Sequence, residues 1–517
     1  MGLATSLRAR LVVGAVALAA PAGCVLWTDF APLASGLAAD AGDAAAIPQA
    51  DAADAEGGPP AAVGDLEYVK TWDGVAVGSL ATFGEDTVVA ASAAEPVVID
   101  GRKVPITRDD VVVMRLDPRG NVGWITTFGG DVPSAADRPS RVSVGPDAAY
   151  VAGFFDEPTL QIGTDVLSRR GGYRAGFVAK IDAATGTQSW GRAIAHENPA
   201  FDLWCPGVAA TPQGAAVACT FSGALVHVGP SDFATGANGG GREIAIAFFG
   251  VAGLLKWVNI LKGTGDDVAS SLAVDPATGD LLFAANVGSK SLKDTLTPLD
   301  LAQTGATTGS VPFVARYDEA TGKAIWSKVL PEGSLVNVVR GAPDGATVLV
   351  AGQISKPVDF GLGTVTPRGA GDAFVLALDA ATRAPRWQKL IGGTNTVGAE
   401  IANDLAVDRW GEVVVVGFNR SLDTAVDGKP VPSPPQHVTD GWGSFMVKLS
   451  PSGQVLWTRG YSTQALGDAV GMASVDATPS GKLRVSGGLQ GTAPLDGTNN
   501  VTAKFTVYQQ VLWGFGP

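Results

Sequence analysis

Cysteine, histidine and methionine are scarce in this chain: its 517 residues include three Cys, three His and four Met. No two cysteines are adjacent, and none belongs to a haem-attachment motif. The sequence also has no zinc-hydrolase helix motif, no phosphate-binding loop and no G-x-S-x-G turn. These absences speak against the common metal-, thiol- and serine-dependent enzymes.

Charge and long apolar runs are also limited. Only 17% of the residues are charged and the net charge is −13, so the basic stripe that binds nucleic acid is missing. No segment reaches the roughly eighteen apolar residues of a membrane-spanning helix. Instead there are 68 Gly and 32 Pro among many Val, Ala and Leu residues. That composition is typical of short strands joined by tight turns.

The first 23 residues have the pattern of an export signal. Arg8 and Arg10 precede an apolar run, residues 11–20, and small residues follow. The segment 21–24, Pro-Ala-Gly-Cys, resembles a bacterial lipobox, although Pro21 stands where an aliphatic residue is usual. We therefore predict a lipoprotein-type signal peptide over 1–23, lipidation of Cys24 and anchoring at the outer membrane or cell surface. Ordinary cleavage nearby, with Cys24 as an incidental thiol, is the alternative.

Residues 24–63 form a linker, and residues 34–63 are mostly Ala, Asp, Gly and Pro without aromatics. Such a segment cannot bury enough surface to offset its chain entropy. We predict a disordered tether over 24–63 and a folded domain over 64–517.

Tryptophans recur along the folded part at nearly constant intervals of 66, 67, 69, 61, 70 and 56 residues. Each follows a short apolar strand and a turn. A fixed period of this length is typical of repeat proteins. The recurring residues are Trp124, Trp190, Trp257, Trp326, Trp387, Trp457 and Trp513.

Each period contains four short strands separated by turn residues, as in the copy over 271–330, and this predicts a β-propeller blade. The third strands are counted from Val111, Phe177, Ile244, Phe313, Phe374, Phe445 and Phe505. The expected fold is therefore all-β, with seven four-stranded blades; six or eight remain open if an end copy is misread. Residues 68–71 resemble a fourth strand, so we expect them to pair near the C-terminal blade and close the ring.

We assign the seven tryptophans to packing between blades, because each can bury about 150–250 Å². At about 25 cal/mol per Å² this amounts to at most about 4–6 kcal/mol per blade. A stacking platform for a sugar or a cofactor is the competing interpretation.

The segment 179–190, Ala-Lys-Ile-Asp-Ala-Ala-Thr-Gly-Thr-Gln-Ser-Trp, and its copy over 315–326 resemble the tryptophan-docking repeat of PQQ-like propellers. The wider unit is similar to the SBBP-type β-propeller repeats of bacterial surface proteins, over about residues 65–517. The resemblance implies a propeller that is a scaffold, a binder or an enzyme. Quinoprotein dehydrogenases of this likeness hold their quinone with adjacent cysteines, a calcium site and an Asp base. The lack of adjacent cysteines here speaks against redox catalysis.

A few residues are candidates for special roles. Cys205 and Cys219 flank a turn centred on Pro212 and are expected to form a disulfide in an exported protein, with a metal pair as the alternative. His196 and Glu197, with Asp202, suggest an acid/base or metal pair, but a solvated loop is the preferred interpretation.

Acids recur before the first strands, and these are Asp137, Asp202, Asp267, Glu400 and Asp468. They could bind calcium or cap turns, and the repetition favours capping. Asp266 and Asp267 are the best single metal candidate.

We conclude from the sequence that the chain is an exported, lipid-anchored, non-catalytic propeller that binds or scaffolds envelope or surface proteins. Its membrane contact is expected through the lipid, with no nucleic-acid partner and no cofactor other than a calcium ion. A degenerate quinoprotein-like enzyme is one alternative. A glycan-binding propeller is the other, with Trp442 and Tyr173 in the strand two–three connections.

Overall fold

The computed structural model describes residues 66–515, with gaps at 108, 131–135, 198–201, 235–240, 298–299, 304–308, 433–442, 463–468, 491, 495–499 and 503–508. All regular elements in the described part of the chain are strands, and none of it forms a helix that could cross a membrane. The predicted signal peptide, Cys24 and the tether lie outside the described residues, as do His437, Trp442 and Asp468.

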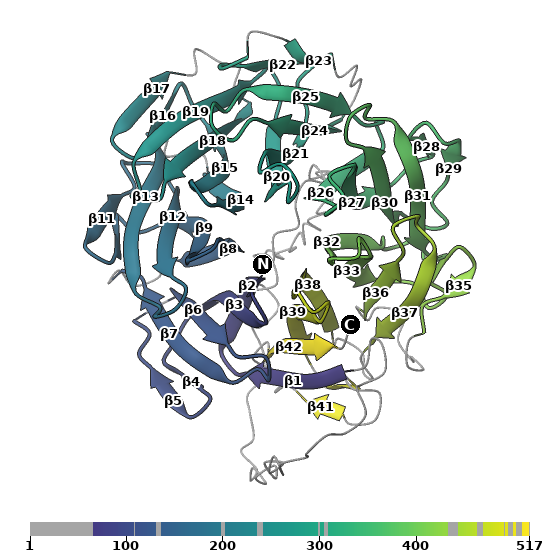
Figure 1. The fold of residues 1–517 in the computed structure, drawn as a ribbon, viewed down its shortest axis with the longest axis horizontal. Coiled ribbons are helices and arrows are strands. Elements are labelled where there is room, and N and C mark those ends of the chain that lie inside the picture. The colour runs from purple at the N-terminus through teal and green to yellow at the C-terminus, as the bar shows by residue number, and fades with distance from the viewer. Residues whose placement is uncertain are drawn as a thin grey trace, which may run out of the picture.

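The strands form seven antiparallel four-stranded blades around a centre (Figure 1). The prediction of a seven-bladed, all-β propeller is therefore confirmed. The first strands, nearest the centre, are β2 (Val75–Phe83), β8 (Asp137–Val144), β14 (Trp204–Thr211), β20 (Asp267–Val274), β26 (Ser334–Gly341), β32 (Ile401–Val407) and β38 (Ala469–Ala477). The second strands are β3 (Asp86–Ala93), β9 (Ala148–Phe155), β15 (Gly214–Ser222), β21 (Leu281–Val287), β27 (Thr347–Ile354), β33 (Val413–Asn419) and β39 (Leu483–Gln490).

The outer half of each blade holds the third and fourth strands. The third strands are β6 (Asp110–Leu116), β12 (Ala175–Asp182), β18 (Arg242–Gly250), β24 (Val311–Tyr317), β30 (Asp372–Asp379), β36 (Gly443–Leu449) and β42 (Gln509–Phe515). The fourth strands, at the rim, are β7 (Val122–Phe128), β13 (Gln188–His196), β19 (Leu255–Lys262), β25 (Ala324–Val329), β31 (Pro385–Gly392), β37 (Val455–Tyr461) and β1 (Leu66–Trp72).

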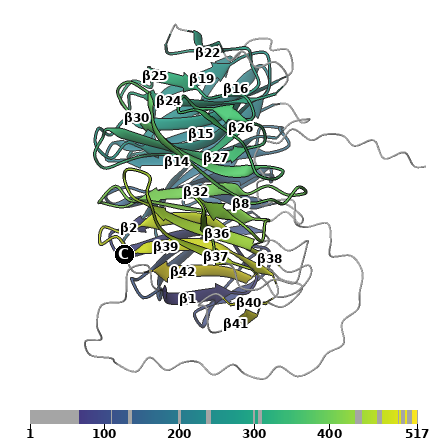
Figure 2. The same cartoon turned by 90° about the vertical axis from the view of Figure 1, so that its right-hand side faces the viewer.

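The two ends of the folded part complete one blade together. β1 pairs antiparallel with β42, and the two lie side by side in both views (Figures 1 and 2). The expected closure by residues 68–71 is thus confirmed, because Tyr68 lies opposite Gly514 and Thr71 opposite Val511.

The details of the seventh blade correct the sequence interpretation. Phe505 lies outside the described residues, and the third strand of this blade is β42. Trp513 is therefore on the third strand, not the fourth, and Tyr68 takes the place that tryptophan holds in the other fourth strands. The N-terminal segment supplies the fourth strand of this blade, because β1 pairs with β42 in the register that fourth strands have with third strands in the other blades.

Side chains reinforce this closure on the inner strands. The amide and hydroxyl of Thr82 donate to the Asp476 carboxylate at 2.7 and 3.0 Å. At the turns between the first and second strands of the same two blades, Ser480 donates from its amide and its hydroxyl to Glu85 at 2.9 and 2.6 Å. The first and seventh blades are therefore joined by polar contacts as well as by the chain, which runs from β1 of the seventh blade into β2 of the first.

A small hairpin lies between the second and third strands of every blade. These hairpins are β4–β5 (Val97–Ile99, Arg102–Val104), β10–β11 (Thr159–Ile162, Asp165–Ser168), β16–β17 (Leu225–Val228, Ser231–Ala234), β22–β23 (Ser291–Asp294, Asp300–Gln303), β28–β29 (Val358–Asp359, Thr364–Val365), β34–β35 (Ala425–Val426, Lys429–Pro430) and β40–β41 (Thr492–Pro494, Asn500–Thr502). Three of them extend the preceding blade, by pairing β16 with β13, β22 with β19 and β34 with β31. They cover outer strand edges that would otherwise invite pairing with another chain.

The hydrophobic core is divided into clusters that lie between neighbouring blades. Phe128 of the first blade, for example, meets Phe177 of the second edge to face, with ring centroids 5.6 Å apart. Since both faces of a blade are covered in this way, the middle strands are almost continuously apolar, and every residue of β9 is buried.

Candidate functional site

At the turns between third and fourth strands, the sequence repeat makes a contact between blades. The Asp182 carboxylate accepts hydrogen bonds from the Thr185 amide and hydroxyl, both at 2.8 Å. This turn places Gly186 at a φ of 77°, a conformation that favours glycine. The Trp124 ring lies against that glycine, where a Cβ would be only 2.7 Å from it. The indole Nε1 donates to the Ala183 carbonyl at 3.1 Å.

The same contact recurs around the ring. Equivalent pairs, each with a glycine at positive φ, are Trp190 on Gly253, Trp257 on Gly322, Trp387 on Gly453 and Tyr68 on Gly120. The three indoles donate to the carbonyls of Val251, Glu319 and Pro451 at 3.0, 2.8 and 2.9 Å. These rings are engaged in blade packing.

Two tryptophans depart from this pattern. The indole nitrogens of Trp326 and Trp457 are buried without a hydrogen-bond partner in the described part of the chain. The turn of the fifth blade has Arg383, at a φ of 63°, in the place of the glycine. The seventh blade has no such turn, because its fourth strand comes from the other end of the domain. For Trp513 the structure gives only the backbone position.

Charged side chains from distant blades meet at the centre of the ring. Asp404 on β32 is fully buried and accepts from Arg141 of β8 at 2.7 Å and from Arg340 of β26 at 2.9 Å. The strands β8 and β32 lie on opposite sides of the centre (Figure 1). The Ser474 hydroxyl donates to the same carboxylate at 2.9 Å. One carboxylate therefore links the second, fifth, sixth and seventh blades.

The electrostatics of this cluster favour an ionised Asp404. Burial by itself would raise the pKa of Asp404, but the two guanidinium groups and Ser474 outweigh burial and hold the pKa below its ordinary value. Sequence reasoning missed this cluster. The available signal was the presence of Arg141, Arg340 and Asp404 in otherwise apolar or small-residue first strands.

The residues present do not fit the quinone site of quinoprotein dehydrogenases. The described cysteines, Cys205 and Cys219, are joined to each other across the β14–β15 hairpin and are 14 residues apart in sequence. Asp404, the acid at the centre, is engaged by two arginines and so is not placed as a free base.

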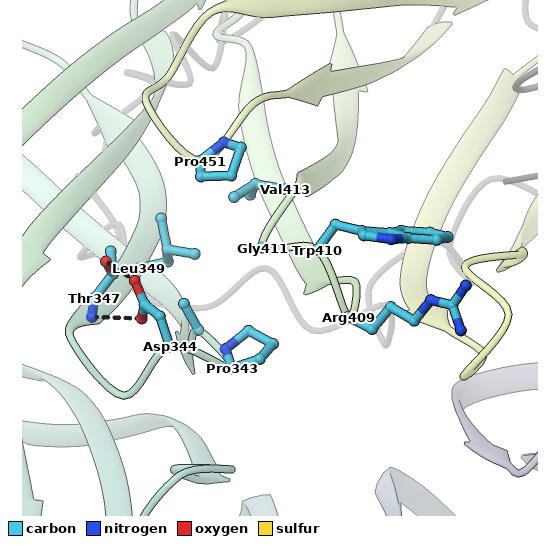
Figure 3. A pocket seen from close by; sticks show the side chains of 10 residues that line it. Pro343, Asp344, Thr347, Leu349, Arg409, Trp410, Gly411, Val413 and Pro451 are labelled. Carbon is cyan, nitrogen blue, oxygen red and sulfur yellow. Dashed lines mark hydrogen bonds between the residues drawn. The ribbon is translucent and has the colours of Figure 1, made fainter.

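A cavity of about 310 Å³ opens between the fifth and sixth blades at the turn ends of their strands (Figure 3). Its walls include Pro343 and Asp344 of one turn, Trp410 and Arg409 of the next, and Pro451. Trp410 is 49% exposed, and the Arg409 guanidinium lies 4.2 Å from the centroid of its ring.

Trp410 departs from the repeat. The corresponding positions in other turns between first and second strands hold Gln213, Asp344 and Ser480. One edge of the Trp410 ring packs on Gly481 of the next blade, and about half of the side chain remains open to solvent. A large aromatic residue is therefore presented where the fold elsewhere uses a small or polar one.

The predicted metal pair is engaged in structural contacts. Asp266 accepts from the Arg242 amide at 2.9 Å, while Asp267 is buried and accepts from the Ser289 amide and hydroxyl at 3.0 and 2.7 Å. Burial raises the pKa of Asp267 to about 6, although the Ser289 bonds partly offset it. No group of three or more His, Cys, Asp or Glu side chains arranged for a metal occurs within the described ranges.

The residues proposed from the sequence as an acid/base or metal group around His196 also have different partners in the structure. His196 and His227 lie on the paired strands β13 and β16, and His227 Nδ1 is 2.6 Å from Asp232. Glu197 approaches the other ring nitrogen of His227 at 3.3 Å, while Asp202 pairs with Arg174 at 3.5 Å. Asp202 is thus not grouped with His196 and Glu197 as the acid/base or metal interpretation required. The preferred interpretation, a solvated loop, is wrong for His196, because this residue ends strand β13 and is fully buried.

The glycan candidates are not brought together in the described residues. Tyr173 is 52% exposed beside Arg174, and Trp442 lies outside the described residues.

No protein-family model and no curated protein matches the chain. Several solved structures have a similar overall arrangement. Hydrazine synthase of Kuenenia stuttgartiensis is 14% identical, with 84% of this chain and 96% of that chain covered and a TM-score of 0.43. BamB of Moraxella catarrhalis is 12% identical, with 88% and 100% covered and a TM-score of 0.34. Quinohemoprotein alcohol dehydrogenase of Comamonas testosteroni is 14% identical, with 87% and 76% covered and a TM-score of 0.35. Likenesses this distant carry nothing about function.

Proposed function

We propose that this chain is a non-catalytic propeller that binds a protein partner with the surface around Trp410. The supporting observation is the half-exposed indole beside Arg409 at the edge of the cavity between the fifth and sixth blades. Trp and Arg dominate the energetic centres of protein interfaces. The indole also adds contact area at little entropic cost, since one edge already packs on Gly481.

The repeat itself argues for a binding role of this residue. A serine, an aspartate or a glutamine suffices at the same turn position in other blades, so blade packing does not require an indole there. The closed ring presents the turn on a rigid frame, which lowers the cost of ordering the surface on binding.

We place this binding role at the cell envelope, as an exported protein anchored through Cys24, on the evidence of the N-terminal sequence. Replacing Cys24 with serine is expected to move the protein from the membrane fraction to the soluble exported fraction. Equal membrane retention of both forms would reject the lipid anchor.

The binding proposal is tested by placing a photo-crosslinking residue at position 410, in intact cells of the native host, and identifying the adduct. Position 213, an exposed residue of the equivalent turn in the third blade, is the matched control. One stoichiometric protein adduct from 410 and none from 213 is expected. The change Trp410→Ser, which copies position 480, should abolish co-purification of that partner without loss of folding.

Equal adducts from both positions, or none from either, would reject this surface. The half-exposed indole could also stack on a sugar. If no protein adduct forms and soluble envelope glycans release the propeller from the envelope fraction, the glycan-binding alternative would be favoured.

A further inference from the structure

The turns between first and second strands and between third and fourth strands lie on one face of the propeller, the turn face. At the strand ends on the opposite face, three junctions between blades share one arrangement. At each, a buried acid is the first residue of the first strand of a blade or directly precedes that strand. A glycine just after the fourth strand of the preceding blade lies beside the acid. The third member of the arrangement is the second residue after the end of the second strand of the same blade. The acids are Asp137, Asp267 and Glu400, and the third members are Glu157, Ser289 and Ser421.

Two of these junctions are satisfied internally. Between the third and fourth blades, Asp267 accepts from the amide and hydroxyl of Ser289. Between the fifth and sixth blades, Glu400 accepts from the Ser421 amide at 2.9 Å and the Arg420 amide at 3.2 Å. In both, the serine fills the space that a Cβ on the neighbouring glycine would take.

The junction between the first and second blades differs in its chemistry. Glu157 stands where the other two have serine, and its carboxylate fills the space beside Gly130. Asp137 and Glu157 are each only 1% exposed. Both carboxylate oxygens of Asp137 are buried, and neither accepts a hydrogen bond of normal geometry from the described residues, although the Gly130 amide lies near the carboxylate. A second carboxylate has thus replaced the hydroxyl donor that satisfies the acid elsewhere.

Two carboxylates in such a place disfavour ionisation. Burial, together with the charges of Glu157, Asp156 and Asp110, raises the pKa of Asp137 to about 8, and the Gly130 amide offsets this only in part. A bound cation would supply the missing positive charge and satisfy the orphaned oxygens. Carboxylate oxygens are ligands for hard cations, and calcium tolerates irregular oxygen geometry better than magnesium does.

We propose that Asp137 and Glu157 hold a calcium ion at the junction between the first and second blades, with backbone oxygens and water completing its coordination. This site is independent of the Trp410 surface. It differs from the Asp266–Asp267 pair, where Ser289 already satisfies the acid.

The proposal is tested on the purified exported protein after chelation and dialysis, by calorimetric titration with calcium chloride and by thermal unfolding with and without calcium. Binding of one equivalent and a rise in melting temperature are expected. Glu157→Ser copies the residue at the other two junctions, so it should fold. It should bind no calcium, and it should melt higher than the metal-free wild type because a buried charge repulsion is gone. Asp267→Asn is the matched control and should leave calcium binding unchanged.

Three results would overturn the proposal. One is a wild-type protein that neither binds calcium nor gains stability from it, as expected if the two carboxylates share a proton instead. Another is unchanged calcium binding by Glu157→Ser. The third is a melting temperature raised equally by magnesium and by calcium, which would remove the assignment to calcium.

Discussion

The two faces of the propeller differ in how strictly they keep the residues of the repeat. One is the turn face, which carries the turns between first and second strands and between third and fourth strands, and the other carries the opposite strand ends. On the turn face, five junctions keep the same contact between an aromatic ring and a glycine at positive φ. At the opposite strand ends, three acid junctions keep the same positions, but one exchanges a serine for Glu157. The ring contact depends on shape, and a side chain on the glycine would collide with the aromatic ring. The acid contact depends on charge and hydrogen bonding, which can be satisfied in more than one way.

The comparison teaches where to look for function in a repeat protein. Positions that repeat stabilise the ring, and positions that break the repeat without helping the packing are free for other roles. Trp410, Glu157 and the central Asp404 all break it. At Trp410 and Glu157 a substitution is therefore expected to separate function from stability, whereas Asp404 links four blades and a substitution there tests stability itself.

The largest expected effect is at Asp404, which has no counterpart in the other first strands. Asp404→Ala leaves two arginines facing each other at the centre, with Arg141 and Arg340 largely buried. Removing one partner of a buried ion pair costs about 3–5 kcal/mol. The free energy of unfolding in urea measures the loss. Lys389→Ala removes an ion pair near the surface and should cost about 0–1 kcal/mol. Equal losses for both variants would contradict the central role of Asp404.

The pH dependence of the same residue gives a second test. The pKa of Asp404 is lowered in the folded protein, so its stabilising contribution is present above the unfolded pKa, about 3.9. That contribution is lost as the pH falls through the lower folded pKa. The difference in unfolding free energy between wild type and Asp404→Ala should therefore shrink on acidification below about pH 4. A difference that stays constant down to about pH 2 would show that the charge of Asp404 is not what stabilises the ring.

Smaller losses of stability are expected to distinguish a junction with the regular contact between tryptophan and glycine, at Trp257, from the irregular junction at Trp326. Trp257→Phe keeps an aromatic ring but removes the bond from Nε1 to the Glu319 carbonyl, which should cost about 1 kcal/mol beyond the loss of ring area. Trp326→Phe loses no such bond. We expect Trp257→Phe to be the more destabilised of the two in chemical unfolding. The reverse order would mean that the bond adds nothing to the contact.

The smallest expected change is a gain. Arg383 adopts a φ of 63° where the other turns have glycine. Arg383→Gly should relieve this strain and stabilise the protein by up to about 1 kcal/mol after the added chain entropy of glycine. Gly322→Ala should act in the opposite direction, because a Cβ there would lie 2.5 Å from the Trp257 ring. A neutral or destabilising Arg383→Gly would indicate that the arginine side chain contributes to the junction.

Much of the fold could be predicted from the sequence because its determinants are local. The Asp-x-x-Thr-Gly turn is built from hydrogen bonds within five residues, as at Asp182, Thr185 and Gly186. The tryptophan that packs on such a turn lies on the preceding blade, about one period away. The prediction failed at the seventh blade, where Trp513 lies on the third strand and Tyr68 of β1 takes the place that tryptophan has on the other fourth strands.

The candidate sites could be predicted from the sequence only in part. Sequence reasoning missed Trp410, although this tryptophan lies outside the regular period, because nothing local indicates that about half of its surface remains exposed beside a cavity. Asp137 is one of the recurring acids in the sequence, but its proximity to Glu157 depends on how β8 and β9 pair. The sequence favoured the Asp266–Asp267 pair as the metal site, but in the structure the Ser289 hydroxyl donates to Asp267 and gives it a structural partner.

The sequence by itself predicted an all-β propeller of seven blades, with six or eight left open, the strands of the first six blades and a role of the tryptophans in packing between blades. These depend on turns and periods that act over one repeat. Only the tertiary structure decided which charges meet. Arg141 and Asp404 are 263 residues apart, and they form an ion pair because closure of the ring brings the first strands of distant blades to a common centre. No local pattern encodes such a pairing, since it depends on how many blades close the ring and on which side chains each contributes to the centre.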